Sequence, residues 1–209
     1  RVVGNGTPES CTGFELLGAM WSGAGNGGWV TFDCGPDPAT IEMLPFNFID
    51  KQLTIDGAGL VTLIAPAGAS HFATSYNSAP THLTLRNLTL TGGTNRAINV
   101  GANTTVVVHD SFITGNHAAG AGGAIGVAAG GTLELHRSSV SGNSSDAAAG
   151  AISNSGTTKI YDSDISLNTG GTGGAIASGS SATLQISRSS FVGNTSRVRG
   201  GAIATNGKF

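Results

Sequence analysis

The chain has 209 residues, of which 34 are glycine and 11% are charged, and its formal net charge at pH 7 is −2. This composition lacks the excess of basic residues that nucleic-acid-binding proteins normally carry, so no nucleic-acid partner is expected. No apolar run approaches the roughly 20 residues of a membrane-spanning helix, and no membrane span is expected in this chain. Short apolar runs between Gly, Ser, Thr and Asn predict one domain, 1–209, with an N-terminal segment (1–29), irregular coils (30–93) and regular repeats (94–209).

The first predicted element is a short amphipathic helix that begins after residue 12. The stretch from Thr12 to Glu15 has the T-x-x-E form of a capping box. Phe14, Leu17 and Trp21 fall on one helical face at i, i+3 and i+7. We expect this face to cover the first coil and to hide a sheet edge that would otherwise invite aggregation.

The two cysteines, Cys11 and Cys34, flank the predicted helix. Val30, Phe32 and Cys34 alternate as an inward-facing strand, which would place Cys34 beneath the helix. A metal site would need further ligands close by, so the pair favours a disulfide over a metal. The bridge would close a loop of 34 − 11 = 23 residues.

Trp29 precedes the inward-facing Val30 and should therefore point outward. An exposed tryptophan can stack on a sugar or pack against a partner. It can equally lie under the segment 1–8, and the sequence does not choose between the two.

From residue 94 the sequence repeats every 24 to 27 residues. The word GGAI and its variants place an alanine at 97, 124, 151, 175 and 202, with gaps of 27, 27, 24 and 27. A second word ends in asparagine, and an alternating segment such as TLELHRSSVSGN connects the two. Each repeat holds about three short inward-facing strands, which no single repeat can bury alone.

Stacking the repeats at about 4.8 Å predicts an all-β fold, a right-handed parallel β-helix, whose hand follows from the crossover preference. A β-sandwich predicts hairpins, but the Asp-Gly and Asn-Gly pairs at 56–57 and 206–207 lie outside the clean repeats. The glycines and alanine of GGAI indicate a tight corner, and its isoleucine points into the core. No Asp follows these words at the offset of a calcium repeat, so no metal and no cofactor is expected.

Two columns of polar residues recur from coil to coil. The asparagines are predicted to stack as a ladder in which each amide binds the coils above and below; they are Asn116, Asn143, Asn168 and Asn194. The charged column alternates in sign, so that stacking places each aspartate beside arginines; it comprises Asp110, Arg137, Asp162 and Arg188. In the next outward column Glu134 lies beside Lys159.

The charged column has two interpretations. It can grip an acidic sugar or carry a lyase-type base, or it can be a salt-bridge ladder that fixes the register of the coils. Each acid has a basic neighbour, so we favour the structural ladder. His109 and His136 occupy equivalent positions and should stack, but two ligands without a third make a weak metal site.

The repeat words resemble a known family. FxxN with GGA followed by Ile, Leu or Val is the repeat pair of the bacterial polymorphic outer membrane proteins, and FVGN followed by GGAI matches it directly. The other copies replace Phe by Val or Ile. The stretch that begins GNGTPESCTGFELLGAM looks like the cap and first coils of secreted β-helix proteins with that repeat. The resemblance covers nearly the whole chain and implies a secreted protein at the bacterial cell surface.

Two function classes follow. One is a non-catalytic extracellular scaffold, such as an adhesin or filament subunit, and the other is a pectate-lyase-like enzyme or polysaccharide-binding module. Balanced charge and flat sides favour the scaffold, with Trp29, Glu134 and Lys159 as candidate contacts to a cell-surface or polysaccharide ligand. The sequence ends within a repeat, so either the chain continues in the full protein or a partner docks on the open end. If that partner is another copy, we expect head-to-tail self-association in which Val2 and Val3 pair with a neighbour's last coil.

Overall fold

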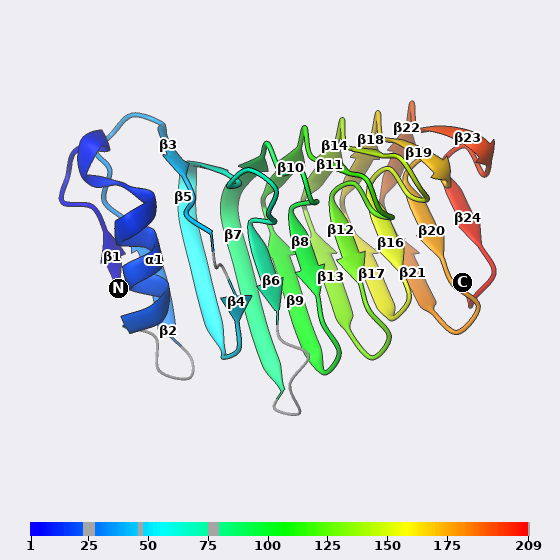
Figure 1. The fold of residues 1–209 in the computed structure, drawn as a ribbon, viewed down its shortest axis with the longest axis horizontal. Helices are drawn as coiled ribbons and strands as arrows, with labels where there is room; N and C mark the ends of the chain where they lie inside the picture. Colours follow the sequence, from blue (N-terminus) through cyan, green and yellow to red (C-terminus); the bar gives the residue numbers. More distant parts are fainter. Residues whose placement is uncertain (23–27, 46–47, 75–79, 209) are drawn as a thin grey trace.

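Short parallel strands dominate the chain. The computed structural model describes residues 1–22, 28–45, 48–74 and 80–208, and Phe209, the last residue of the predicted repeat region, lies outside these ranges. Within them the strands form a β-solenoid of about seven turns with one α-helix near the N-terminus. Figure 1 shows the turns following one another from that helix to the C-terminus. The parallel β-helix predicted from the repeats is confirmed, together with an N-terminal helix.

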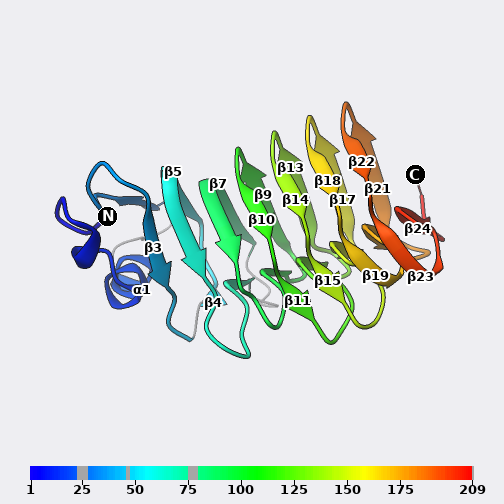
Figure 2. The same cartoon turned by 90° about the horizontal axis from the view of Figure 1, so that it is seen from above.

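The largest sheet has two arms that share long strands. One arm consists of β1 (Val2–Val3), β2 (Gly28–Phe32), β5 (Leu53–Ile64), β7 (Thr81–Thr91), β9 (Thr104–His109), β13 (Thr132–His136), β17 (Thr157–Tyr161) and β21 (Thr183–Ser187). The other arm begins with β3 (Ala39–Glu42), shares β5 and β7, and continues through β10 (Phe112–Thr114), β14 (Ser139–Ser141), β18 (Asp164–Ser166) and β22 (Ser190–Val192). Figure 2 shows the two arms side by side along the solenoid.

Two smaller sheets complete each turn. The four-stranded sheet contains β11 (His117–Ala118), β15 (Ser144–Ser145), β19 (Thr169–Thr172) and β23 (Thr195–Arg199). The seven-stranded sheet contains β4 (Phe48–Ile49), β6 (Phe72–Thr74), β8 (Ile98–Val100), β12 (Ile125–Val127), β16 (Ile152–Asn154), β20 (Ile176–Ser178) and β24 (Ile203–Thr205). The strand pairs formed by the described residues are parallel, so a side chain in one turn has an equivalent in the next turn.

Inward-facing side chains therefore form continuous columns. In the seven-stranded sheet Ile98, Ile125 and Ile152 are successive partners, and Ile176 follows them in register. All four are fully buried. Burial of such a side chain contributes about 1.5–3 kcal/mol, which a single unstacked turn would forfeit. Most of the buried apolar residues that the structure describes form one hydrophobic cluster along the solenoid.

The GGA word forms the corner that precedes a strand of the seven-stranded sheet. Gly122 has a φ of 81°, in the left-handed region that residues with a Cβ rarely adopt. A Cβ on Gly123 would lie 2.2 Å from the carbonyl oxygens of Gly150 and Ser144 in the next turn. The repeated word thus allows the close approach of successive turns.

The N-terminal helix, α1 (Gly13–Ser22), follows a short 3-10 helix, η1 (Pro8–Ser10), and lies across the start of the solenoid (Figure 1). Leu16, Ala19 and Met20 are buried in the core cluster, whereas Phe14 and Trp21 are 73% and 59% exposed. The predicted burial of Phe14 and Trp21 is therefore wrong. The helix sequence GFELLGAMWS has apolar residues on several faces, so its periodicity is compatible with more than one buried face. The face that is buried contains the small Ala19, which lets the helix approach the sheet closely.

The N-terminal strand pairs within its own chain. In β1, Val2 is the partner of Thr31 and Val3 is the partner of Phe32 in β2. Val3 is fully buried. Val2 and Val3 thus belong to the first turn of their own solenoid, and pairing of these residues with a neighbour's last coil stays a prediction.

Candidate functional site

The charged column lies where the two arms of the largest sheet meet. Asp110, Arg137, Asp162 and Arg188 each follow a strand of the first arm and have φ values of 49°, 47°, 50° and 48°. Each of these residues therefore makes a left-handed bend that leads into the second arm. The sequence pattern showed the alternation of charge but gave no sign of this backbone conformation.

Bidentate hydrogen bonds join the charged side chains in pairs. Arg137 donates from Nε to Asp110 Oδ1 and from Nη2 to Asp110 Oδ2, both at 2.8 Å. Arg188 binds Asp162 in the same way, at 2.6 and 2.8 Å. The charged residues stack in the expected order, but both oxygens of each carboxylate accept hydrogen bonds from the arginine of the next turn. Arg137 therefore acts on Asp162 only as a nearby charge.

These hydrogen bonds keep the aspartates ionised. The bond from Arg137 lowers the pKa of Asp110, and the bond from Arg188 lowers the pKa of Asp162. A general acid or base works best with a pKa near the operating pH. The two carboxyl groups are therefore held in a form suited to ion pairing.

The next outward column carries a third ion pair. Lys159 Nζ donates to Glu134 Oε1 at 2.9 Å, and His136 Nε2 lies 3.4 Å from Glu134 Oε2. Burial opposes the ionisation of Glu134, but the bonds from Lys159 and His136 outweigh it, so its pKa is lowered. Glu134 and Lys159, predicted as candidate ligand contacts, thus bind each other.

Aromatic rings stack along the same face of the largest sheet. The ring centroids of His109 and His136 are 4.7 Å apart, and those of His136 and Tyr161 are 5.0 Å apart. Burial and the neighbouring charges of His136 and Arg137 lower the pKa of His109. Within the described residues no group of three His, Cys, Asp or Glu side chains is placed to hold a metal ion.

Trp29 is 49% exposed on β2. The guanidinium carbon of Arg86, two strands further along the sheet, lies 5.9 Å from the centre of its ring. The N-terminal amine of Arg1 donates to the Trp29 carbonyl oxygen, so the N-terminal segment contacts the backbone of this residue and leaves half of its side chain open to solvent. The indole is accessible, with one cation already against it.

The four asparagines are hydrogen-bonded from turn to turn. The side-chain oxygens of Asn143, Asn168 and Asn194 each accept two bonds, at 3.0 Å, from the backbone N–H and the side-chain amide of the asparagine one turn earlier. Asn116, Asn143 and Asn168 are buried. Leaving a buried polar group unpaired costs about 1–3 kcal/mol, so these side chains serve the stacking of the turns.

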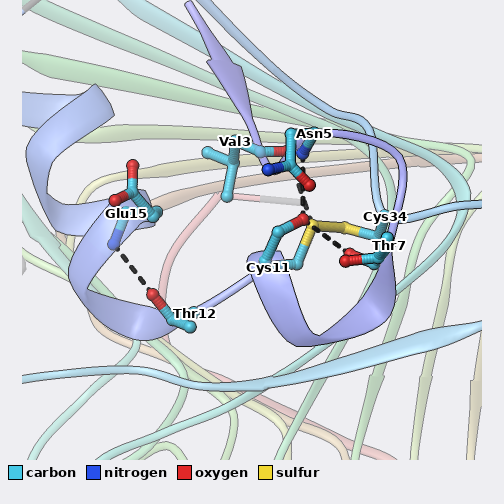
Figure 3. The surroundings of a disulfide bond; sticks show 8 residues. Val3, Asn5, Thr7, Cys11, Thr12, Glu15 and Cys34 are labelled. Atoms are coloured by element: carbon cyan, nitrogen blue, oxygen red, sulfur yellow. Dashed lines mark hydrogen bonds between the residues drawn. A yellow bond between two sulfur atoms is a disulfide. The ribbon is translucent and has the colours of Figure 1, made fainter.

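Cys11 and Cys34 form the predicted disulfide, whose Cα atoms are 5.6 Å apart. Both cysteines are buried, and Figure 3 shows the bridge beside Val3, close to the start of α1. In the same view Thr12 Oγ1 accepts a hydrogen bond from the Glu15 N–H at 3.2 Å, which is the N-cap bond expected of the T-x-x-E sequence. The bridge ties the segment before α1 to the residues that follow β2.

The outer face of the seven-stranded sheet is hollowed, and sequence analysis did not find this feature. Three hollows of about 440, 220 and 310 Å³ succeed one another along the solenoid. The first two share Asn99, and the last two share Ser153 and Ser155. We call this surface the groove. Its floor is an outward-facing column of mostly small side chains, namely Ala73, Asn99, Gly126, Ser153, Ala177 and Ala204.

No family model matches the chain, and neither the curated proteins nor the solved structures contain a match. The resemblance to the polymorphic outer membrane proteins therefore rests on the repeat words alone. In the described ranges, no helix combines the length and the apolar character needed to cross a bilayer.

Proposed function

We propose that this chain is a non-catalytic extracellular β-helix protein with a structural or adhesive role at a cell surface. The observation that carries the proposal is the pairing of the carboxylates of the charged column and of Glu134 with basic side chains. Asp110, Asp162 and Glu134 are each hydrogen-bonded to a basic side chain, and the pKa of each is lowered. A glycoside hydrolase needs a pair of carboxyl groups, one of them with a raised pKa, to act on the substrate.

The disulfide supports the extracellular part of the proposal. Disulfides persist in oxidising compartments and are rare in the reducing cytosol. The Cys11–Cys34 bridge is buried and ties the cap to the first turn. The resemblance of the repeats to bacterial surface proteins agrees with the same setting.

The alternative, a pectate-lyase-like enzyme, is tested by direct assay. Purified protein is incubated with a panel of neutral and acidic polysaccharides, with and without calcium, and new reducing ends and unsaturated products are measured. We expect no cleavage. Cleavage that is lost in Arg137→Ala, with an unchanged melting temperature, would show that the charged column is catalytic and would overturn the proposal.

Self-association is the finer part of this proposal. Val192 in β22 and Val198 in β23 are 61% and 75% exposed, so the surface of the solenoid offers apolar side chains to a second copy. We expect electron microscopy of the longest natural form of the polypeptide to show rods longer than one solenoid. Isolated rods of one solenoid at high concentration would remove the filament role and leave the adhesive role standing.

A further inference from the structure

We propose that the groove binds an extended acidic polysaccharide, with Arg96 and Arg199 as its anion-binding side chains. This deepens the adhesive role proposed above by naming the class of ligand and the surface that takes it. The site differs from the charged column and from Trp29, which lie on the largest sheet.

Arg96 departs from the pattern of the later turns. The residue before the corner alanine is glycine in each following repeat, whereas here it is an arginine with a φ of 58°. A residue with a Cβ is disfavoured in this region of backbone space. Such an outlier in an otherwise regular array points to a role for the side chain.

The side chain of Arg96 lies in the groove. It lines the middle hollow, and a Cβ added to Gly126 in the next turn would lie 2.0 Å from its Nη1 atom. The guanidinium thus rests directly on the floor of the groove, and the glycine leaves the room for it. The guanidinium of Arg96 in one turn thus packs against Gly126 in the next turn, where a larger residue would displace it.

The charge of the groove has one sign. Among the described residues that line the three hollows, the charged side chains are Arg96 and Arg199. Arg199 is exposed, and none of the ion pairs formed by the described residues includes it. The remaining polar lining offers donors and acceptors for hydroxyl groups, among them Ser70, Asn95, Asn99, Ser153, Ser155 and Asn206.

The spacing of the two arginines calls for an extended ligand. The guanidinium of Arg96 lies over β12, and Arg199 lines the hollow that includes Ala177 of β20 and Ala204 of β24. At about 4.8 Å for each strand, the two cations are separated by roughly 10 to 14 Å along the groove. A polymer with an acidic group every few sugar units can reach both, whereas a single small anion cannot.

A polysaccharide fits this floor better than an acidic peptide does. Peptides that bind β-sheets usually add a strand to an open edge through main-chain hydrogen bonds. The floor of the groove is the face of a sheet whose strands already pair with their neighbours on both sides. The surface therefore offers side-chain hydroxyl, amide and guanidinium groups, which suit sugar hydroxyl and acid groups.

The test measures binding to immobilised polygalacturonate, which carries carboxylates, and to dextran sulfate, which carries sulfates. Neutral dextran and poly-glutamate are run in parallel. We expect the wild-type protein to bind at least one of the acidic polysaccharides and not dextran. Arg96→Gly gives the position the residue of the later turns, so the fold should be retained while binding weakens about tenfold or more. Arg199→Gln should weaken binding in the same direction.

Arg137→Gly is the matched control. It also removes one arginine from a left-handed position, but Arg137 lies outside the groove. The proposal requires that this variant binds as the wild type does. Equal losses in Arg96→Gly and Arg137→Gly would show attraction by overall charge and would overturn the assignment. Binding to poly-glutamate as tight as to the polysaccharides would indicate a peptide ligand, and no binding to either acidic polysaccharide would also overturn it.

The outcomes separate this inference from the proposed function. Cleavage of a bound polysaccharide would overturn the non-catalytic role and leave the groove as the binding surface. Attachment of the protein to cells that is unaffected by Arg96→Gly would leave the adhesive role and remove the groove from it.

Discussion

At the scale of single residues, one left-handed residue in each turn makes the bend between the arms of the largest sheet. Asparagine and aspartate tolerate this conformation because their short side chains bind nearby backbone groups, and Asn87 and Asp110 follow this preference. Arginine has no such local compensation. At Arg137 and Arg188 the bend also directs a guanidinium to the carboxylate of the preceding turn, so the ion pair and the backbone conformation depend on each other.

Substitution of Arg137 separates these two effects. Arg137→Ala loses the bonds to Asp110 and keeps a Cβ in the left-handed region, whereas Arg137→Gly loses the same bonds and relieves the backbone. We expect Arg137→Ala to be modestly less stable than the wild type, since exposed ion pairs contribute little. Arg137→Gly should melt at a higher temperature than Arg137→Ala. The reverse order, measured by circular dichroism, would contradict the account of the bend.

His71 is a buried residue that the repeat pattern did not reveal. It occupies the place of the corner alanine in an irregular early turn, ahead of Phe72, which is in register with Ile98. Its Nε2 atom lies 3.0 Å from the Leu63 carbonyl oxygen. Burial lowers the pKa of His71 to about 4.

The lowered pKa of His71 predicts a loss of stability in weak acid. Between pH 6.5 and about 4 the unfolded chain binds a proton at this residue that the folded chain does not, so the free energy of unfolding falls as the pH drops. The loss should reach about 2–3 kcal/mol near pH 4.5 and should not grow below pH 4, where both states are protonated. Urea titrations at pH 7.5 and 4.5 should show this difference shrinking in His71→Asn. It should persist in His82→Asn, which replaces an exposed histidine. An equal loss in the His71 variant would rule out this residue as the cause.

At the scale of elements, the sequence was most informative where a pattern repeats. The isoleucine after GGA and the asparagine of the second word recur in every regular turn, and stacking alone places them in columns. The sequence of α1 does not repeat, and its apolar residues lie on several sides, so the sequence did not decide which face of the helix is buried. The left-handed bend depends on the backbone angles of residues such as Arg137, and the groove depends on the space around residues such as Gly126. Neither property can be read from the residue type alone.

The corrected face of α1 gives a direct test. Met20 is fully buried, so Met20→Ala should cost about 2–5 kcal/mol through lost burial and the cavity that it leaves. Trp21 is mostly exposed, and Trp21→Ala should change stability by about 0.5 kcal/mol or less. Urea unfolding followed by circular dichroism compares the two variants. A larger loss in Trp21→Ala would restore the face that the sequence predicted.

At the scale of the whole molecule, the chain is nearly one-dimensional. Each turn pairs with the turns before and after it, and the hydrophobic cluster is continuous along the solenoid. Stability in such arrays is close to a sum of local terms and nearest-neighbour terms. Damage at one end is therefore expected to remain local, and the disulfide between Cys11 and Cys34 provides a way to apply it.

Reduction of the disulfide should loosen the cap and spare the middle. In the loop-entropy model a bridge that closes this loop contributes roughly 3 kcal/mol, and that contribution acts on α1 and the first strands. Thiol labelling of the native protein should find no reactive cysteine before reduction, because both residues are buried and bridged. After reduction, hydrogen exchange should rise in residues 1–22 and 28–34 while strands β12 and β16 keep their protection. The double variant Cys11→Ser with Cys34→Ser should show the same local pattern without a reductant. If exchange rises equally along the solenoid, the turns unfold as a single cooperative unit and stability is not a sum over neighbouring turns.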